Sequence, residues 1–422
     1  MCILACKDLS LNMRTIRQAR SLARAGHRVT VVGSAVPDAR LARGDKAVNL
    51  IATGTPRSSL LMMNGLWLRG GFLREDAALH RAAESAVAAG CSRGGLFARR
   101  VMNHLAGRSF HVVQAHFDRA LLAASVLSRR NGAKLVFDAV EVPFDEEMLP
   151  RTRSARAVRL AEIRREAEIA RHADGWITVN ESLADAAVER FGVVRPMVLR
   201  NFQDKGRWAS DGRLRSDIGV TREARILLHL NTMRRGEGIE TAIDALAHLP
   251  AAFHLVALGP APERGFLRSM RRRAEALGVA KRFHVAPLQP PHAIPAYIAG
   301  ADIGIIAREG GLQNLRLSLP NRLFQMIAAR LPVVATPLPE IARILRSWRL
   351  GLLFEQSDAA SLAASVRKVI EPSALRRFKD AVDKAACALT WEEESVAYVR
   401  FIEQLAGGEP IRAPEMSGIA AL

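Results

Sequence analysis

One stretch decides the fold: Ser318-Leu-Pro-Asn-Arg-Leu-Phe-Gln-Met-Ile-Ala-Ala-Arg-Leu-Pro-Val-Val-Ala-Thr336. Pro320 suits the first turn of a helix, and Ser318 stands close enough to cap it. Apolar residues then recur at helical spacing, as Leu323, Phe324 and Ile327. This pattern predicts a helix over 321–329 with one buried stripe. The apolar run at 332–335 predicts a parallel strand directly after that helix.

The same alternation of short apolar strands and amphipathic helices extends in both directions. We expect strands at 1–6, 29–32, 111–115, 135–138, 176–179, 226–230, 253–258, 283–285, 303–306 and 332–335. We expect helices at 13–25, 120–130, 156–172, 239–247, 266–277, 293–299, 321–329 and 391–405. Alternation of this kind is typical of βαβ units, and right-handed crossovers make such units doubly wound.

A chain of 422 residues is long enough for two domains. The polar stretch 200–224 interrupts the alternation and is interpreted as a linker. The predicted fold class is therefore α/β, with two doubly wound Rossmann-like domains facing a central cleft. We expect these domains at 1–200 and 201–390, followed by a crossover helix at 391–407 and a tail at 408–422. Ligands of such folds bind beyond the carboxyl ends of the strands.

The charge is strongly basic and uneven. The formal net charge is +19, and residues 1–200 hold 31 of the 61 basic residues but 19 of the 42 acidic ones. Two interpretations stay open: an anionic partner such as a lipid surface or nucleotide, or a general preference for arginine. Four cysteines without metal or disulfide spacing, and an apolar strand at the start, predict a cytoplasmic protein. No apolar run is long enough to span a bilayer, so any membrane contact is expected to be peripheral.

The segment 58–107 does not fit the alternation. It interleaves pairs such as Leu66-Trp67 and Leu96-Phe97 with arginines and contains few acids. Such a segment can be a helical insertion packed on the sheet, or an interfacial helix that contacts anionic lipid. Both readings remain open at this stage.

The stretch 318–336 resembles the donor-binding helix of GT-B glycosyltransferases of the glycosyltransferase family 4 type. In that family a Pro-Asn-Lys/Arg-Leu-Phe-Glu segment opens the helix, and a Leu-Pro-Val-Val strand follows it. Further segments resemble the family in the same order along residues 1–405. They lie at 12–17, 21–27, 110–116, 137–141, 173–182 and 200–201. The ordered set carries the resemblance, because each segment alone is unspecific.

The resemblance implies a nucleoside-diphosphate sugar as donor, with a UDP- or GDP-sugar expected and no metal or permanently bound cofactor. The amino end of the predicted helix offers free N–H groups and the positive end of its dipole to a diphosphate. A guanidinium at that end can grip phosphate oxygens with two hydrogen bonds. The expected donor-binding residues are Arg234, Arg235, Asn321, Arg322, Leu323 and Gln325.

Other candidates lie at predicted strand ends. By resemblance, His116 is expected near the transferred sugar or the acceptor, as a hydrogen-bond donor or proton shuttle. Glu141 is a candidate general base or acceptor-binding group, and Glu309 a candidate sugar contact. The acceptor-side candidates are Arg14, Arg17, Asn180 and Glu181. For the arginines, a solvated helix face is the alternative.

Several positions depart from the family pattern. Glu237 stands where a cation would precede Gly238, and a carboxylate there is expected to repel phosphate, with Arg234 and Arg235 supplying charge instead. Gln325 replaces the Glu that binds the ribose hydroxyls. Two further departures are Val140, in place of a His, and Arg330, in place of a helix-ending Gly.

The sequence therefore predicts sugar transfer to a carbohydrate or lipid-linked acceptor, in surface polysaccharide or glycolipid synthesis. The resemblance implies retention of anomeric configuration. One alternative is a catalytically impaired scaffold on the same fold, because of the substitutions at 140, 237 and 325. The other is a nucleic-acid-binding protein, which charge alone suggests. The aromatic content of 5% and the lack of a nucleic-acid motif disfavour it.

Overall fold

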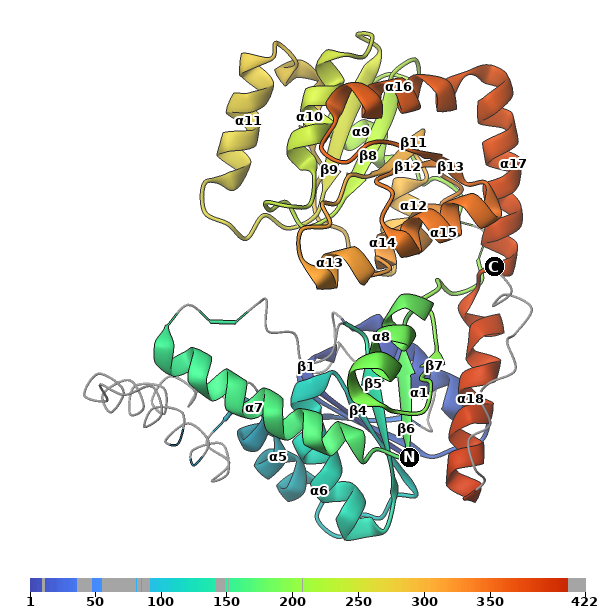
Figure 1. Cartoon of the computed structure of the whole chain (residues 1–422). Helices are drawn as coiled ribbons and strands as arrows, with labels where there is room; N and C mark the ends of the chain where they lie inside the picture. The colour runs from blue at the N-terminus through green and yellow to red at the C-terminus, as the bar shows by residue number, and fades with distance from the viewer. Residues whose placement is uncertain are drawn as a thin grey trace. The chain divides into compact units, whose positions relative to one another are not determined.

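The computed structural model describes residues 1–9, 12–35, 48–54, 81, 85, 92–141, 149–150, 152–206 and 208–408. The chain divides into two compact units. Unit 1 comprises Met1–Arg200 and the part of the last helix that starts at Ser395, and unit 2 comprises Asn201–Glu394. Figure 1 shows the helices and strands of each unit.

Unit 1 is built on a seven-stranded parallel sheet in the order β3-β2-β1-β4-β5-β6-β7. Its strands are β1 (Cys2–Asp8), β2 (Val29–Ala35), β3 (Val48–Ala52), β4 (Val112–His116), β5 (Lys134–Ala139), β6 (Gly175–Thr178) and β7 (Met197–Val198). Strands β4 and β6 are buried along their whole length, as expected when helices cover both faces of a parallel sheet.

Two sets of helices cover this sheet (Figure 1). One face carries α5 (Arg93–His104), η2 (Asp118–Ala120), α6 (Leu121–Asn131) and α7 (Arg153–Arg171), and Phe97, Phe137 and Trp176 lie in its core. Side chains of α1 (Met13–Arg24) and of α18 (Trp391–Gly407) contact the other face through polar groups. Helix α8 (Glu181–Phe191) connects β6 to β7.

Unit 2 repeats the plan with a six-stranded parallel sheet in the order β10-β9-β8-β11-β12-β13. Its strands are β8 (Arg225–Leu230), β9 (Phe253–Leu258), β10 (Phe283–Val285), β11 (Ile303–Ile306), β12 (Val333–Ala335) and β13 (Gly351–Leu353). The prediction of two doubly wound Rossmann-like sheets is confirmed.

Alternate residues of each strand in unit 2 point into separate cores. Leu228 and Val333 belong to one core, and Leu227 and Val334 belong to the other. The first core is covered by α9 (Arg213–Ile218), α12 (Ile294–Ile298), α14 (Asn321–Ala328), α15 (Pro339–Trp348) and α17 (Pro372–Ala388). The second is covered by α10 (Ile239–Ala247), α11 (Phe266–Ala276) and α16 (Ala359–Ile370). A short helix, α13 (Gln313–Leu317), and a 3-10 turn, η3 (Ala280–Arg282), complete the unit.

The expected elements recur within a few residues, with two corrections. The stretch 200–224 is not a linker over its whole length. It contains α9, whose Leu214 is fully buried in the core of unit 2. Ser318 does not cap α14: Pro320 takes the N-cap position, and the Ser318 hydroxyl donates to the Leu315 carbonyl at 3.1 Å. The expected elements did not include the short strands β3, β7 and β13, nor several helices, among them α8, α15, α16 and α17.

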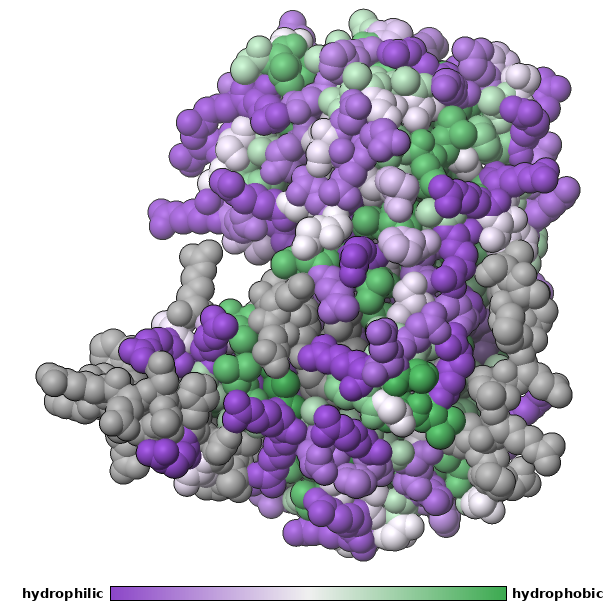
Figure 2. All heavy atoms as spheres, viewed as in Figure 1, coloured by the Kyte–Doolittle hydropathy of each residue, from purple (hydrophilic) through white to green (hydrophobic). Residues whose placement is uncertain are grey.

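The segment 58–107 is described in part. Helix α5 packs on the sheet through Phe97 and Val101, while Arg99 is exposed. The packed-insertion interpretation therefore holds for α5, and most of the rest of 58–107, to which the lipid-contact alternative also applied, lies outside the described residues. Over the parts of the chain that the structure describes, no helix is both long and apolar enough to cross a bilayer. Hydrophilic side chains cover most of the face seen in Figure 2.

Arg330 ends α14 in the left-handed backbone region, with φ 63°. The expected cost of a non-glycine residue at this position is therefore present in the fold. Its side chain compensates, because Nη1 donates to the Asp383 carbonyl at 2.6 Å and to the Asp383 carboxylate at 3.2 Å. This contact ties the end of α14 to α17.

Two substitutions separate the backbone cost from the side-chain contact. Arg330→Ala loses the contact and keeps the strain, so we expect the free energy of unfolding to fall by about 1–2 kcal/mol. Arg330→Gly loses the same contact but relieves about 1 kcal/mol of strain. Urea unfolding should therefore rank the wild type first, Gly second and Ala last. Equal stability of the two variants would refute the strain argument.

Candidate functional site

Both sheets have a topological switch point, where the chain reverses its direction of strand addition. In unit 2 the chain builds β8, β9 and β10 outward and then returns to place β11 beside β8. In unit 1 it builds β1, β2 and β3 and then returns to place β4 beside β1. Ligands of open α/β sheets bind at the carboxyl ends of the strands at this point. The chain therefore has one candidate site in each unit.

In unit 2 the switch point holds three arginines around one buried carboxylate. Glu237, in the loop after β8, is 2% exposed. Arg308, two residues after β11, donates to it through Nε at 3.0 Å and Nη2 at 3.2 Å. Arg322, in the first turn of α14, donates to it at 3.1 Å, as does Arg234. We call these four residues the arginine cluster. With all four groups ionised, its net charge is +2.

The charges in this cluster stabilise one another. Burial alone would raise the pKa of Glu237, but the guanidinium groups of Arg322 and Arg308 lower it to about 2. Burial and the charge of Arg308 lower the pKa of Arg322 to about 9, so its guanidinium still carries a proton at neutral pH. The Nε of Arg322 is buried and has no hydrogen-bond partner among the described residues. The cluster therefore has an unused donor.

Two glycines let the loop after β8 approach β11. Gly236 accepts a hydrogen bond from the Glu309 N–H at 3.0 Å. Gly238 has φ 79°, and a Cβ at this position would lie 1.9 Å from the Ala307 carbonyl oxygen. Only glycine permits this approach. The two glycines therefore allow the loop to come close enough to β11 for Glu237 to contact Arg308.

This geometry shows which groups Glu237 contacts. We expected its carboxylate to repel phosphate, but it is buried and bonded to three guanidinium groups and to the Asn231 amide. Its charge orients the cations and leaves the excess charge of the cluster positive. Arg308 was absent from the expected residues, because nothing in the sequence around β11 distinguishes it from other arginines.

The other expected donor-side residues lie near the cluster but differ in exposure. Asn321 and Arg235 are exposed, and Gln325 and Glu309 are half-buried. Leu323 is fully buried in the core below α14, so its side chain anchors the helix, and its N–H donates to the Pro320 carbonyl at 3.0 Å. The predicted buried stripe of Leu323, Phe324 and Ile327 is confirmed.

In unit 1 the switch point leads to a second buried network. Asp138, on β5, is fully buried and accepts hydrogen bonds from Arg14 Nε at 3.1 Å and Arg14 Nη2 at 2.9 Å. Gln18 donates to the same carboxylate at 2.7 Å. His116, the last residue of β4, contacts it through Nδ1 at 3.0 Å. The network extends to α18, because the Tyr398 hydroxyl donates to Gln114 at 2.9 Å.

This network fixes the state of His116. Burial lowers the pKa of His116, so the ring is neutral at pH 7. Arg14 and His116 hold the pKa of Asp138 well below its usual range, against the effect of burial, so its carboxylate only accepts hydrogen bonds. Nδ1 of His116 must then carry the proton. Nε2 is left as an acceptor, buried and without a partner among the described residues.

The residue after His116 is strained. Phe117 is in the left-handed region with φ 63°, and Lys7 Nζ lies 3.3 Å from the centroid of its ring. Backbone strain of this kind is common at functional sites, where the surrounding structure holds a residue in one geometry.

The remaining acceptor-side candidates have structural partners. Arg14 and Arg17 are 2% and 7% exposed, so a solvated face is wrong for both. Asn180 caps α8 by accepting from the Leu183 N–H at 2.8 Å. The Glu181 carboxylate accepts hydrogen bonds from Arg195 Nη2 at 2.8 Å and from Arg200 Nη2 at 3.1 Å. Glu141 is exposed beyond the end of β5.

Residues 224–372, about a third of the chain, match the family model described as glycosyl transferases group 1. A stretch of 131 residues is 27% identical to WcaL of Salmonella typhimurium, a protein named as a colanic acid biosynthesis glycosyltransferase. The match covers 30% of this chain and spans about a third, 32%, of that relative. The matched family region contains the whole arginine cluster.

Two solved structures resemble nearly the whole chain. Sucrose-phosphate synthase from Thermosynechococcus elongatus aligns with a TM-score of 0.72 and 14% identity, over 97% of this chain and 100% of that one. Alr3699/HepE from Anabaena, in complex with UDP, aligns with a TM-score of 0.68 and 14% identity, over 96% of this chain and 100% of that one. At this identity the structures establish the shared fold. Residues 224–372 therefore resemble the group 1 glycosyltransferases, and the chain has the GT-B fold of these solved structures.

Proposed function

We propose that this chain transfers a sugar from a nucleoside-diphosphate sugar to an acceptor, and that the arginine cluster binds the donor diphosphate. The observation that carries the proposal is the excess of guanidinium charge around Glu237 at the switch point of unit 2. The first turn of α14 adds backbone N–H groups and the positive end of a helix dipole.

The cluster suits charge development on a leaving diphosphate. When the bond to the sugar breaks, negative charge grows on the diphosphate oxygen, and groups already held in place stabilise it without reorganisation. Arg308 and Arg322 are held by Glu237, and Arg234, 42% exposed, is the cation that a ligand reaches most directly. Guanidinium groups would then supply the charge that a metal ion supplies elsewhere.

In unit 1 we assign His116 to a hydroxyl group of the sugar or acceptor. Its Nε2 is a free acceptor, so it would receive a hydrogen bond rather than donate one as first expected. Asp138 positions the ring by accepting from Nδ1. Glu141, Glu309 and the ribose contact of Gln325 remain candidates for sugar and nucleotide recognition.

The acceptor is proposed to be a growing surface polysaccharide or a lipid-linked sugar. The name of WcaL, which refers to colanic acid biosynthesis, supports the polysaccharide, although the similarity covers only 30% of this chain. UDP is the first nucleotide to test, because the similar Anabaena protein was solved with UDP. Retention of configuration rests on the family resemblance.

Calorimetric titration with UDP, GDP and ADP tests the donor site. One nucleotide should bind, and Arg234→Ala should weaken its binding by about tenfold or more, because a hydrogen bond to a charged group contributes roughly 1.5–3 kcal/mol. Arg273→Ala is the matched control, since Arg273 is similarly exposed and also paired with an acid, Asp244 on α10, which is not part of the arginine cluster. Absence of binding by all three nucleotides would favour the alternative that the chain is a catalytically impaired scaffold. Salt-sensitive oligonucleotide binding would favour the alternative that the chain is a nucleic-acid-binding protein.

Glu237→Gln separates repulsion from positioning. The substitution makes the site more positive, so simple repulsion predicts tighter nucleotide binding. We expect weaker binding instead, by about tenfold, because the three arginines lose the ionised partner that orients them. A thermal melt should also show destabilisation, since removing one partner of a buried ion pair costs roughly 3–5 kcal/mol. Tighter binding by this variant would show that Glu237 opposes the ligand.

His116→Gln tests the site in unit 1. Nucleotide affinity should be unchanged, whereas turnover of the nucleotide sugar should fall by about 100-fold, as for loss of a group that assists proton transfer. The wild-type pH profile provides a second readout. Because the pKa of His116 is lowered, the neutral ring persists below pH 6.5, and its contribution to activity should be lost only at more acidic pH. An acidic limb centred on pH 6.5 or above would contradict this state of the ring.

A further inference from the structure

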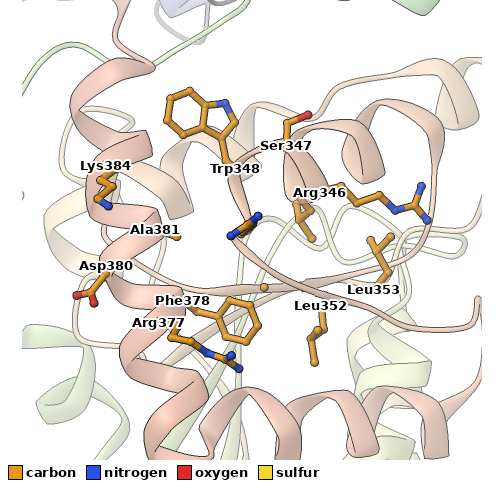
Figure 3. A pocket seen from close by; sticks show the side chains of 13 residues that line it. Arg346, Ser347, Trp348, Leu352, Leu353, Arg377, Phe378, Asp380, Ala381 and Lys384 are labelled. Carbon is orange, nitrogen blue, oxygen red and sulfur yellow. The ribbon is translucent and has the colours of Figure 1, made fainter.

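A pocket of about 800 Å³ lies away from the switch point, in unit 2, between the end of α15, strand β13 and helix α17 (Figure 3). Strand β13 is the last strand of its sheet, so within the part of the chain that the structure describes one of its edges has no neighbouring strand. A volume of this size suits a small-molecule group rather than a single ion.

The floor of the pocket is apolar. Leu352 comes from β13 and Phe378 comes from α17, with its ring directed towards the strand, and both pack against the same core (Figure 3). Leu353, the next residue of β13, also lines the pocket but points to the opposite face of the strand. All three are half-buried rather than buried. Figure 2 shows hydrophobic side chains gathered over β13 beside α17. This floor would favour an apolar portion in any ligand.

Four cations surround the floor. Arg346 and Arg349 come from the end of α15, and Arg377 and Lys384 come from α17. The one acid in the lining, Asp380, points away from the floor in Figure 3. Within the described residues, no ion pair joins any of the four cations to an acid. Other arginines of the same unit are paired, as Arg215 is with Asp302 and Arg273 is with Asp244.

Arg349 supplies a second observation. It ends α15 in the left-handed region with φ 54°, where glycine is strongly preferred. Arg330 accepts the same strain at the end of α14, and there the side chain anchors α17. The Arg349 side chain has no such anchor among the described residues, although it keeps the backbone cost. A residue that keeps backbone strain while its side chain makes no anchoring contact is a candidate for a role in binding.

We propose that this pocket binds the phosphate-bearing head group of an anionic lipid at a bilayer surface. The four cations attract the phosphate, and Phe378 and Leu352 meet the apolar boundary of the lipid. A free phosphate would satisfy the cations but leave the floor in contact with water. The site lies outside the arginine cluster, so it does not depend on nucleotide binding.

Vesicle sedimentation tests the site with a pair of matched variants. Arg349→Gly combined with Arg377→Gln removes two pocket cations, and the glycine relieves strain, so the variant should stay folded. Arg271→Gln combined with Arg272→Gln removes two exposed cations of α11 and changes the net charge equally. The probe is phosphatidylcholine vesicles with and without phosphatidylglycerol. A thermal melt and nucleotide titration confirm that both variants are folded.

We expect the wild type to bind the anionic vesicles and not the neutral ones. The pocket variant should bind about 30-fold more weakly, and the α11 variant much less so. Equal losses in the two variants would show attraction by net charge alone. Failure of the wild type to bind anionic vesicles would overturn the proposal, as would saturable binding of inorganic phosphate that the pocket variant loses without any vesicle binding.

Discussion

The donor site depends on one buried carboxylate shared by three guanidinium groups. Like charges this close repel one another, and Glu237 is the counter-charge that lets Arg308 and Arg322 be held in a nearly dry environment. The glycines of the loop after β8 bring the carboxylate there, and the stripe of α14 fixes the position of Arg322. The packing of the core therefore fixes the positions of the charged groups at the site.

Unit 1 uses the same principle, with a buried carboxylate at the centre of the network. Asp138 is fully buried and gathers Arg14, Gln18 and His116. The carboxylate sets the tautomer of the histidine and leaves one ring nitrogen for a ligand. Helix α18 begins in unit 2 and supplies Tyr398 to this network, so the final helix is part of the structure of unit 1.

Much of the fold could be predicted from the sequence. Apolar runs and helical periodicity placed β8, β9 and α10 within a residue of their observed bounds, because most residues of each element are buried. Short strands such as β13 were missed, since three half-buried residues leave no pattern. The arginines of the site were partly predicted from the motif around Arg322. Arg308 was not, and the ion pairs of Glu237 were not expected, because a sequence does not reveal which way a charged side chain turns.

A crystal structure of the chain with its preferred nucleoside diphosphate would test the central claim most directly. The account predicts diphosphate oxygens within hydrogen-bond distance of Arg234 and of the first N–H groups of α14, with Glu237 still beneath the arginines. A diphosphate bound elsewhere, or a Glu237 carboxylate turned away from all three guanidinium groups, would contradict it.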